Sequence, residues 1–110
     1  MKNRIERINQ LIRERVAEVL SRDIFVKGSL ITVQEVSTSK DLNHAKIKVS
    51  VMPFSESAKV MKILEKQAPT IQAKLNLVVR IKFVPRIKFY LDVSEEKAGR
   101  VEEILRNITK

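Results

Sequence analysis

The chain has 110 residues, a length typical of one domain, and its 44% hydrophobic content is ordinary for a globular protein. Its 22 Lys and Arg outnumber its 13 Asp and Glu, and the net charge of +9 favours an anionic partner such as nucleic acid. The lack of cysteine excludes disulfides and thiolate metal sites, and no apolar run reaches the roughly 18 residues of a membrane span. No secretory signal is visible either. We therefore expect one cytoplasmic domain over residues 1–110, without membrane contact.

The first predicted element is an amphipathic helix over residues 4–21. Asn3 can cap this helix, and Glu6 follows three residues later in a capping-box pattern. Its apolar stripe has the spacing of one helical face and consists of Ile5, Ile8, Ile12, Val16 and Val19. Three cations within an arc of about 80° on one flank are candidate RNA contacts: Arg4, Arg7 and Arg15.

Two strands and a connecting turn follow, and together they predict a β-hairpin. Residues 30–38 are rich in β-branched side chains with irregular alternation, which indicates a bulge. Residues 40–43 have the composition of a turn. Residues 44–52 alternate cleanly, so one face is apolar and the other is predicted to carry Lys46, Lys48 and Ser50.

A helix is predicted from a cap at Ser55 to about Gln67. Pro69 is expected to interrupt it, because proline has no amide proton and disfavours helical geometry at Ala68. A second helical pattern resumes at once, and its apolar positions are Ile71, Leu75 and Val78. Lys74 on this second segment is also included among the candidate RNA contacts.

The segment 80–92 alternates with a period of two and predicts a long strand. Its apolar positions are Ile81, Phe83, Pro85, Ile87, Phe89 and Leu91, so both phenylalanines are expected in the core. Its cations are Arg80, Lys82, Arg86 and Lys88. Tyr90 shares the charged face, where a base can stack on its ring.

A final helix is predicted from Ser94 onward, with Gly99 inside it. A three-stranded sheet with helices packed on one face would bury every apolar stripe, which gives an α+β class. The full order is α-β-β-α-kink-α-β with a C-terminal helix. The other face of the sheet would then present five cations together: Lys46, Lys48, Lys82, Arg86 and Lys88.

Several segments in this order resemble the ribosome-binding factor A family, a K-homology-like (KH-like, type II) single domain. The resemblance rests on Arg7–Val16, on the pair Ile31–Ser37 and Asp41–Ser50, on Arg80–Asp92 with Pro85 and Phe89, and on Gly99–Leu105. It implies a cytoplasmic, non-enzymatic assembly factor that needs no cofactor and is associated with cold adaptation. Such a protein binds the immature small (30S) ribosomal subunit and promotes late maturation and 5′-end processing of its 16S rRNA. We expect a monomer, with ribosome-assembly GTPases as candidate partners.

The chain departs from the family pattern around Pro69. K-homology domains generally clamp the nucleic-acid backbone with a Gly-x-x-Gly loop, but the glycines here are Gly28 and Gly99. The family has an Ala-x-Gly kink where this chain has Gln67-Ala68-Pro69, and an arginine where this chain has Gln72. Proline offers no amide to a phosphate. The predicted RNA contacts therefore fall on side-chain cations.

Other functions remain open from the residues alone. A basic protein-interaction module, or a general nucleic-acid-binding protein, would have the same composition. Ser39, Asp41 and His44 lie close in sequence, but a polar turn does not supply the pocket that a catalytic triad needs. One histidine without cysteine argues against zinc. We expect no enzyme active site and no metal.

Overall fold

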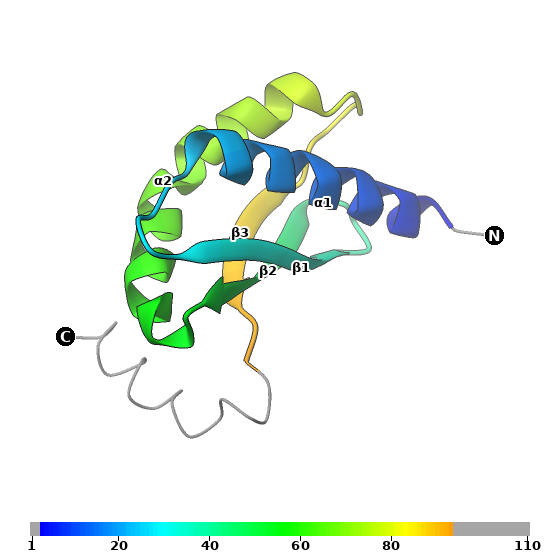
Figure 1. Ribbon diagram of the computed structural model, residues 1–110. Coiled ribbons are helices and arrows are strands. Elements are labelled where there is room, and N and C mark those ends of the chain that lie inside the picture. Colours follow the sequence, from blue (N-terminus) through cyan, green and yellow to red (C-terminus); the bar gives the residue numbers. More distant parts are fainter. Residues whose placement is uncertain (1–2, 94–110) are drawn as a thin grey trace.

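The structure, a computed structural model, describes residues 3–93, in which two helices cover one side of a small sheet. The elements in chain order are α1 (Arg4–Asp23), β1 (Leu30–Thr38), β2 (His44–Met52), the 3-10 helix η1 (Phe54–Glu56), α2 (Ser57–Val78) and β3 (Arg86–Leu91). The strands are ordered β1-β2-β3, and α1 and α2 lie on the same side of them (Figure 1). The predicted α+β class with a three-stranded sheet is confirmed. The helix predicted from Ser94 lies outside the described residues.

Helix α1 begins at Arg4, as the sequence predicts, and ends at Asp23, two residues later than predicted. The Asn3 side-chain oxygen accepts a hydrogen bond from the Glu6 amide at 2.8 Å, which satisfies one of the free donors of the first turn. Its apolar stripe faces the sheet, and Ile12 and Val16 are fully buried. The helix therefore contributes to the core through the positions that its periodicity marked.

The hairpin of β1 and β2 also matches its prediction, bulge included. The strands pair antiparallel, and the register shifts between Val33 and Glu35, which leaves Gln34 as the extra residue. The side-chain amide of Gln34 donates a hydrogen bond to the hydroxyl of Ser50 on β2 at 2.9 Å. Four residues of β2 are essentially inaccessible and form the centre of the core: Ala45, Ile47, Val49 and Val51.

The third strand is shorter than predicted, since β3 covers only Arg86–Leu91 of the segment 80–92. It runs parallel to β2, and its first pair joins Arg86 to His44, the first residue of β2. Residues 80–85 would extend past the end of β2 and find no strand to pair with, so they form a loop instead. Phe83, predicted to be core, lies in this loop and is 74% exposed.

Helix α2 differs from the prediction at its start and its middle. It runs without a break through Pro69, and Ser55 lies in η1 rather than capping the helix. The predicted kink is visible in Figure 1, where the helix axis turns midway along its length. An internal proline costs about 3 kcal/mol. Burial of Leu64 before it and Ile71 and Leu75 after it offsets that cost, at about 1.5–3 kcal/mol for each side chain.

Candidate nucleic-acid interface

The face of the sheet turned away from α1 and α2 carries the predicted cations of β2 and β3. Strand register places Lys46 beside Lys88 and Lys48 beside Tyr90, while Arg86 pairs with His44 at the end of the strand. The intervening residues point into the core, so these five side chains share one surface. We call this surface the open face, and all five of its residues are exposed: Lys46, Lys48, Arg86, Lys88 and Tyr90.

Tyr90 organises the centre of the open face. The Nζ atoms of Lys46 and Lys88 lie 5.7 and 5.6 Å from the centroid of its ring. Each contact is a cation–π interaction, worth about 0.5–1 kcal/mol at an exposed site. The ring, which is 39% exposed, thus contacts two ammonium groups from neighbouring strands. Two such point charges suit the phosphates of a nucleic acid.

Ion pairs divide the ten predicted RNA-binding cations into two groups. Arg15 contacts Glu18 at 2.6 Å, Lys74 contacts Asp23 at 3.1 Å, and Lys48 contacts Glu35 at 3.5 Å. Within residues 3–93, the other seven form no ion pair: Arg4, Arg7, Lys46, Arg80, Lys82, Arg86 and Lys88. The unpaired cations are the stronger candidates, because a phosphate would not have to displace a carboxylate.

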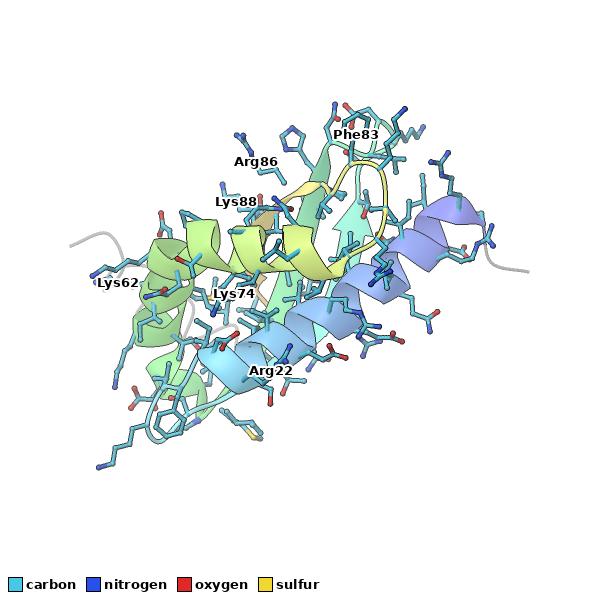
Figure 2. The ribbon with its side chains drawn as sticks, turned by 90° about the horizontal axis from the view of Figure 1, so that it is seen from above. Arg22, Lys62, Lys74, Phe83, Arg86 and Lys88 are labelled. Atoms are coloured by element: carbon cyan, nitrogen blue, oxygen red, sulfur yellow. The ribbon has the colours of Figure 1, made fainter. Side chains whose placement is uncertain are left out.

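The structure does not bring all ten cations together. In Figure 2, Arg86 and Lys88 lie along one side of the molecule with Phe83, whereas Lys74 lies between the two helices. Lys82 is in the loop before β3 and so is not on the open face, which corrects the placement predicted from alternation. Arg80 follows the end of α2 in the same loop.

Arg4, Arg7 and Lys82 meet in a separate place, at the end of the sheet. They line a groove of about 520 Å³ between the start of α1, the β1–β2 turn and the loop before β3. We call it the sheet-end groove. Phe83 also lines it, with Lys82 Nζ 5.7 Å from its ring centroid. Arg15, predicted together with Arg4 and Arg7, is not among the lining residues.

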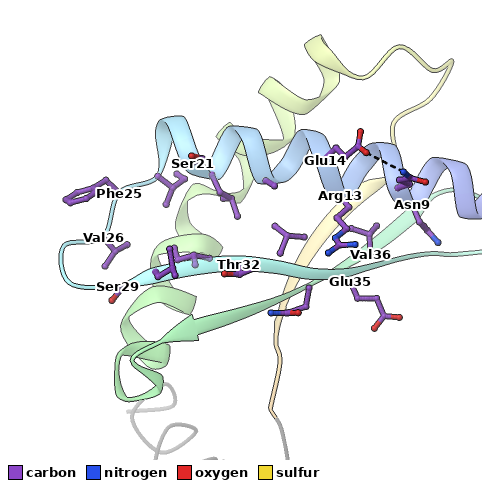
Figure 3. A pocket seen from close by; sticks show the side chains of 18 residues that line it. Asn9, Arg13, Glu14, Ser21, Phe25, Val26, Ser29, Thr32, Glu35 and Val36 are labelled. Carbon is purple, nitrogen blue, oxygen red and sulfur yellow. Dashed lines mark hydrogen bonds between the residues drawn. The ribbon is translucent and has the colours of Figure 1, made fainter.

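A larger groove of about 900 Å³ lies between α1 and β1 (Figure 3). Charges of both signs line it, among them Arg13, Glu14 and Glu35, and Phe25 stands at one end. Carboxylates along the wall repel phosphate. This α1–β1 groove is therefore a poorer match to a polyanion than the open face.

Gln72 positions the start of β3, a role that the sequence interpretation missed. Its side-chain amide donates to the Pro85 carbonyl at 3.1 Å, and its side-chain oxygen accepts from the Ile87 amide at 2.8 Å. The Gln72 side chain thus provides a hydrogen-bond partner to one backbone group on each side of Arg86, the Pro85 carbonyl and the Ile87 amide. Its signal in the sequence is a polar residue placed between Ala68 and Leu75 on a helix face that is otherwise apolar.

The three polar residues of the β1–β2 turn form a turn network. Ser39 Oγ donates to the Asp41 carboxylate at 2.6 Å and accepts from the His44 backbone amide at 3.1 Å. The hydrogen bond from Ser39 and a second from the Asn43 amide hold the pKa of Asp41 below its ordinary value. His44 reaches Ser39 through its backbone, so the arrangement lacks the base–nucleophile contact of a triad.

Metal-binding and membrane-spanning features are also absent from the part of the chain that the structure describes. Residues 3–93 contain no cluster of three or more His, Cys, Asp or Glu placed to hold a metal ion. Neither α1 nor α2, the two long helices of that range, is apolar enough to cross a bilayer.

Comparison with known proteins gives one consistent family. The sequence model described as ribosome-binding factor A matches residues 4–105. A ribosome-binding factor A from Dictyoglomus thermophilum is 40% identical, covering 98% of this chain and 92% of the relative. A crystal structure of ribosome-binding factor A from Thermus thermophilus has a TM-score of 0.67 at 22% identity, covering 81% of this chain and 97% of that one.

A further structural neighbour is a Thermus thermophilus ribosome binding factor A homology model fitted into a cryo-electron microscopy map of its complex with the 30S subunit. It is 25% identical, with a TM-score of 0.61, and covers 74% of this chain and 88% of that one. These proteins share the fold described above over most of their length.

Proposed function

The chain belongs to the ribosome-binding factor A family, and from that premise we propose that it binds the small ribosomal subunit through its 16S rRNA. The observation that carries the proposal is the open face, where Lys46 and Lys88 share the Tyr90 ring and Arg86 lies beside them without an acidic partner in the described residues. A relative of similar fold has been placed in a complex with the 30S subunit, which supports the same partner here.

The contacts available on the open face are suited to the RNA backbone rather than to base edges. Lysine acts on phosphate as a point charge, and arginine can bind it through two parallel hydrogen bonds. Such contacts fix where the protein sits but do not read sequence. We infer that the shape of the folded rRNA, more than its sequence, determines where this protein binds.

We propose that the protein promotes late maturation of the small subunit by binding alone, including processing of the 5′ end of the rRNA. A protein that binds one rRNA conformation more tightly than others increases the population of that conformation. Other factors would then process the rRNA faster, because a larger fraction of it has the correct conformation. Because its binding free energy can act without chemistry, the protein needs neither a catalytic group nor a cofactor.

Other expectations of the family resemblance stay proposals. We propose that the protein acts as a monomer in the cytoplasm, with ribosome-assembly GTPases as partners on the subunit. We also propose a role in cold adaptation. Its physical basis is that wrong RNA pairings dissociate more slowly at low temperature, so a binder that favours the correct fold matters more.

Sedimentation of the purified protein with ribosomal particles tests the proposed function. Mature small subunits, immature small subunits and large subunits are each mixed with the protein over a series of salt concentrations. We expect preference for small subunits, strongest for immature ones, with a logarithmic salt slope of about −3.5 to −4.5 if about five phosphates are neutralised. Equal binding to all three particles would mean nonspecific basic adhesion and would contradict the proposal.

The maturation step needs its own measurement. Immature small subunits are incubated with the processing enzymes of a cell extract from which this protein has been removed. Primer extension then measures the fraction of mature 5′ ends, before and after the purified protein is added back. A faster appearance of mature ends supports the role in processing, and an unchanged rate would limit the protein to binding.

A further inference from the structure

Phe83 is an aromatic side chain that the fold leaves outside its core. It is 74% exposed although it stands in a run of apolar residues, because the loop that carries it extends beyond the last pair of the sheet. A single exposed apolar residue does not by itself mark a binding site, so the groups that share the groove with Phe83 decide its role.

Three cations share the sheet-end groove with this ring. Lys82 lies over it at 5.7 Å, and Arg4 and Arg7 line the same sheet-end groove from α1. The groove also contains one acid, Asp41, but its carboxylate already accepts hydrogen bonds from Ser39 and from the Asn43 amide. The three cations have no acidic partner within residues 3–93. The cations that line the groove therefore outnumber its acid.

The size and lining of the sheet-end groove suit one small, flat, anionic unit of a larger ligand. The volume of about 520 Å³ falls within the range of about 300–1,000 Å³ that is usual for small-molecule sites. Apolar side chains of Ile8, Leu11 and Pro85 line the groove along with the cations. An aromatic ring with neighbouring cations is the combination by which proteins hold unpaired nucleotides, with the base on the ring and the phosphates on the cations.

The sheet-end groove adjoins the open face. Asn43 lines the groove, and its carbonyl accepts the Arg86 amide at 2.9 Å, which fixes the first residue of β3 next to it. Figure 2 shows Phe83, Arg86 and Lys88 along the same side of the molecule. One RNA strand that crosses the open face can thus continue into the groove.

We propose that the sheet-end groove binds an unpaired nucleotide of single-stranded RNA, with its base stacked on Phe83 and the flanking phosphates on Arg4, Arg7 and Lys82. The site rests on the proposed function, because that function supplies rRNA as the ligand. A duplex does not fit this chemistry, since its bases are already stacked and paired. The groove would give a phosphate-binding protein a preference for rRNA that is still partly unfolded.

Tryptophan fluorescence tests this site, because the natural chain has no tryptophan. Phe83→Trp places the only tryptophan of the variant in the groove, and selective excitation separates this fluorophore from Tyr90. The matched control is Phe25→Trp, at a position that is 87% exposed and lies on the α1–β1 groove instead. Both variants are titrated with a single-stranded oligouridylate and with a fully paired RNA duplex of the same charge. We expect saturable quenching of the groove fluorophore by the single strand, with little effect of the duplex and none at the control position.

Phe83→Leu provides the second measurement, because it keeps an apolar side chain but removes the ring. Loss of one stacked base should weaken binding of the single-stranded oligonucleotide by about 5- to 150-fold, while Phe25→Leu should leave it unchanged. Equal quenching at both fluorophores, or unchanged affinity in Phe83→Leu, would overturn the site. Quenching by small subunits but by no oligonucleotide would mean that the groove contacts some other feature of the particle, and would also overturn the site.

The two proposals fail differently. If the unaltered protein binds small subunits with salt-sensitive preference but the groove fluorophore does not respond to RNA, the proposed function stands and the groove site falls. If the unaltered protein shows no preference for small subunits, the proposed function falls. Selective quenching by the single-stranded oligonucleotide would then still support the groove as a nucleotide site.

Discussion

The open face of the sheet and the helical layer behind it are both rich in lysine and arginine, yet two cations of each region differ in the groups that they contact. On the helices, Arg15 and Lys74 contact carboxylates at 2.6 and 3.1 Å. On the open face, Lys48 contacts Glu35 at 3.5 Å, whereas Lys46 and Lys88 contact the ring of Tyr90, which does not neutralise their charge. Net charge alone therefore does not locate a polyanion site; the groups that surround each cation do.

The largest expected effect comes from removing the unpaired cations of the open face. We expect Lys46→Gln, Arg86→Gln and Lys88→Gln together to reduce the slope of log affinity against log salt by about 2, which is about 100-fold in affinity at 0.1 M salt. Sedimentation with immature small subunits over a salt series measures both. Lys82, although predicted on this face, is left unchanged because it lies in the loop before β3.

The matched control removes the same net charge from the helices, through Arg15→Gln on α1 and through Lys59→Gln and Lys74→Gln on α2. We expect affinity for immature small subunits to fall by less than about threefold. At 0.1 M salt, charges on the helices that lie more than about 10 Å from the bound RNA are largely screened from it. The two lost ion pairs are surface pairs worth about 0–1 kcal/mol each, so the fold should remain intact. Equal losses in the two triple variants would remove the distinction between the two regions.

The next effect concerns the contact by which the helical layer supports the open face. Gln72→Leu leaves the Pro85 carbonyl and the Ile87 amide without their side-chain partner, which should lower the free energy of unfolding by about 1–3 kcal/mol. Chemical denaturation measures the change. Gln72→Glu keeps an acceptor for the Ile87 amide but loses the donor, so it should fall between. A fully stable Gln72→Leu protein would mean that β3 is positioned by its pairing with β2 alone.

The smallest effect concerns the ring that holds the two lysines. Tyr90→Leu removes both cation–π contacts, each worth about 0.5–1 kcal/mol. If both contacts help to position the lysines for RNA, we expect a loss of about 5- to 30-fold in affinity for small subunits. The salt slope should stay constant because the charges remain. Tyr90→Phe keeps the ring and should bind like the unaltered protein. A changed slope in Tyr90→Leu would indicate that the ring also positions Arg86.

Much of the fold could be predicted because short-range patterns and tertiary structure agree. The strict alternation of β2 and the stripe of α1 each mark the face that is buried. The prediction that Phe83 lies in the core was wrong for a physical reason. Alternation indicates which side chains share a face of a strand, but it does not indicate whether a neighbouring strand is present to pair with. The pairing of Arg86 with His44 ends the sheet, and no local pattern encodes that limit.

Interactions between distant segments were the part of the site that the sequence could not show. The pair of Lys48 and Glu35 exists because the bulge at Gln34 shifts the register by one residue. The pattern indicated a bulge, but not which carboxylate it would bring opposite Lys48. Likewise, the polarity of Gln72 was visible in the sequence, whereas its two partners on the backbone of β3 follow only from the packing of α2.

Lysine labelling in the complex tests the central claim most directly. The protein is bound to immature small subunits, its accessible lysines are reductively methylated, and mass spectrometry compares each site with the free protein. The account predicts strong protection of Lys46 and Lys88, with Lys59 and Lys74 as reactive as in the free protein. Protection of Lys59 and Lys74, with Lys46 and Lys88 still reactive, would contradict it and place the RNA on the helical layer.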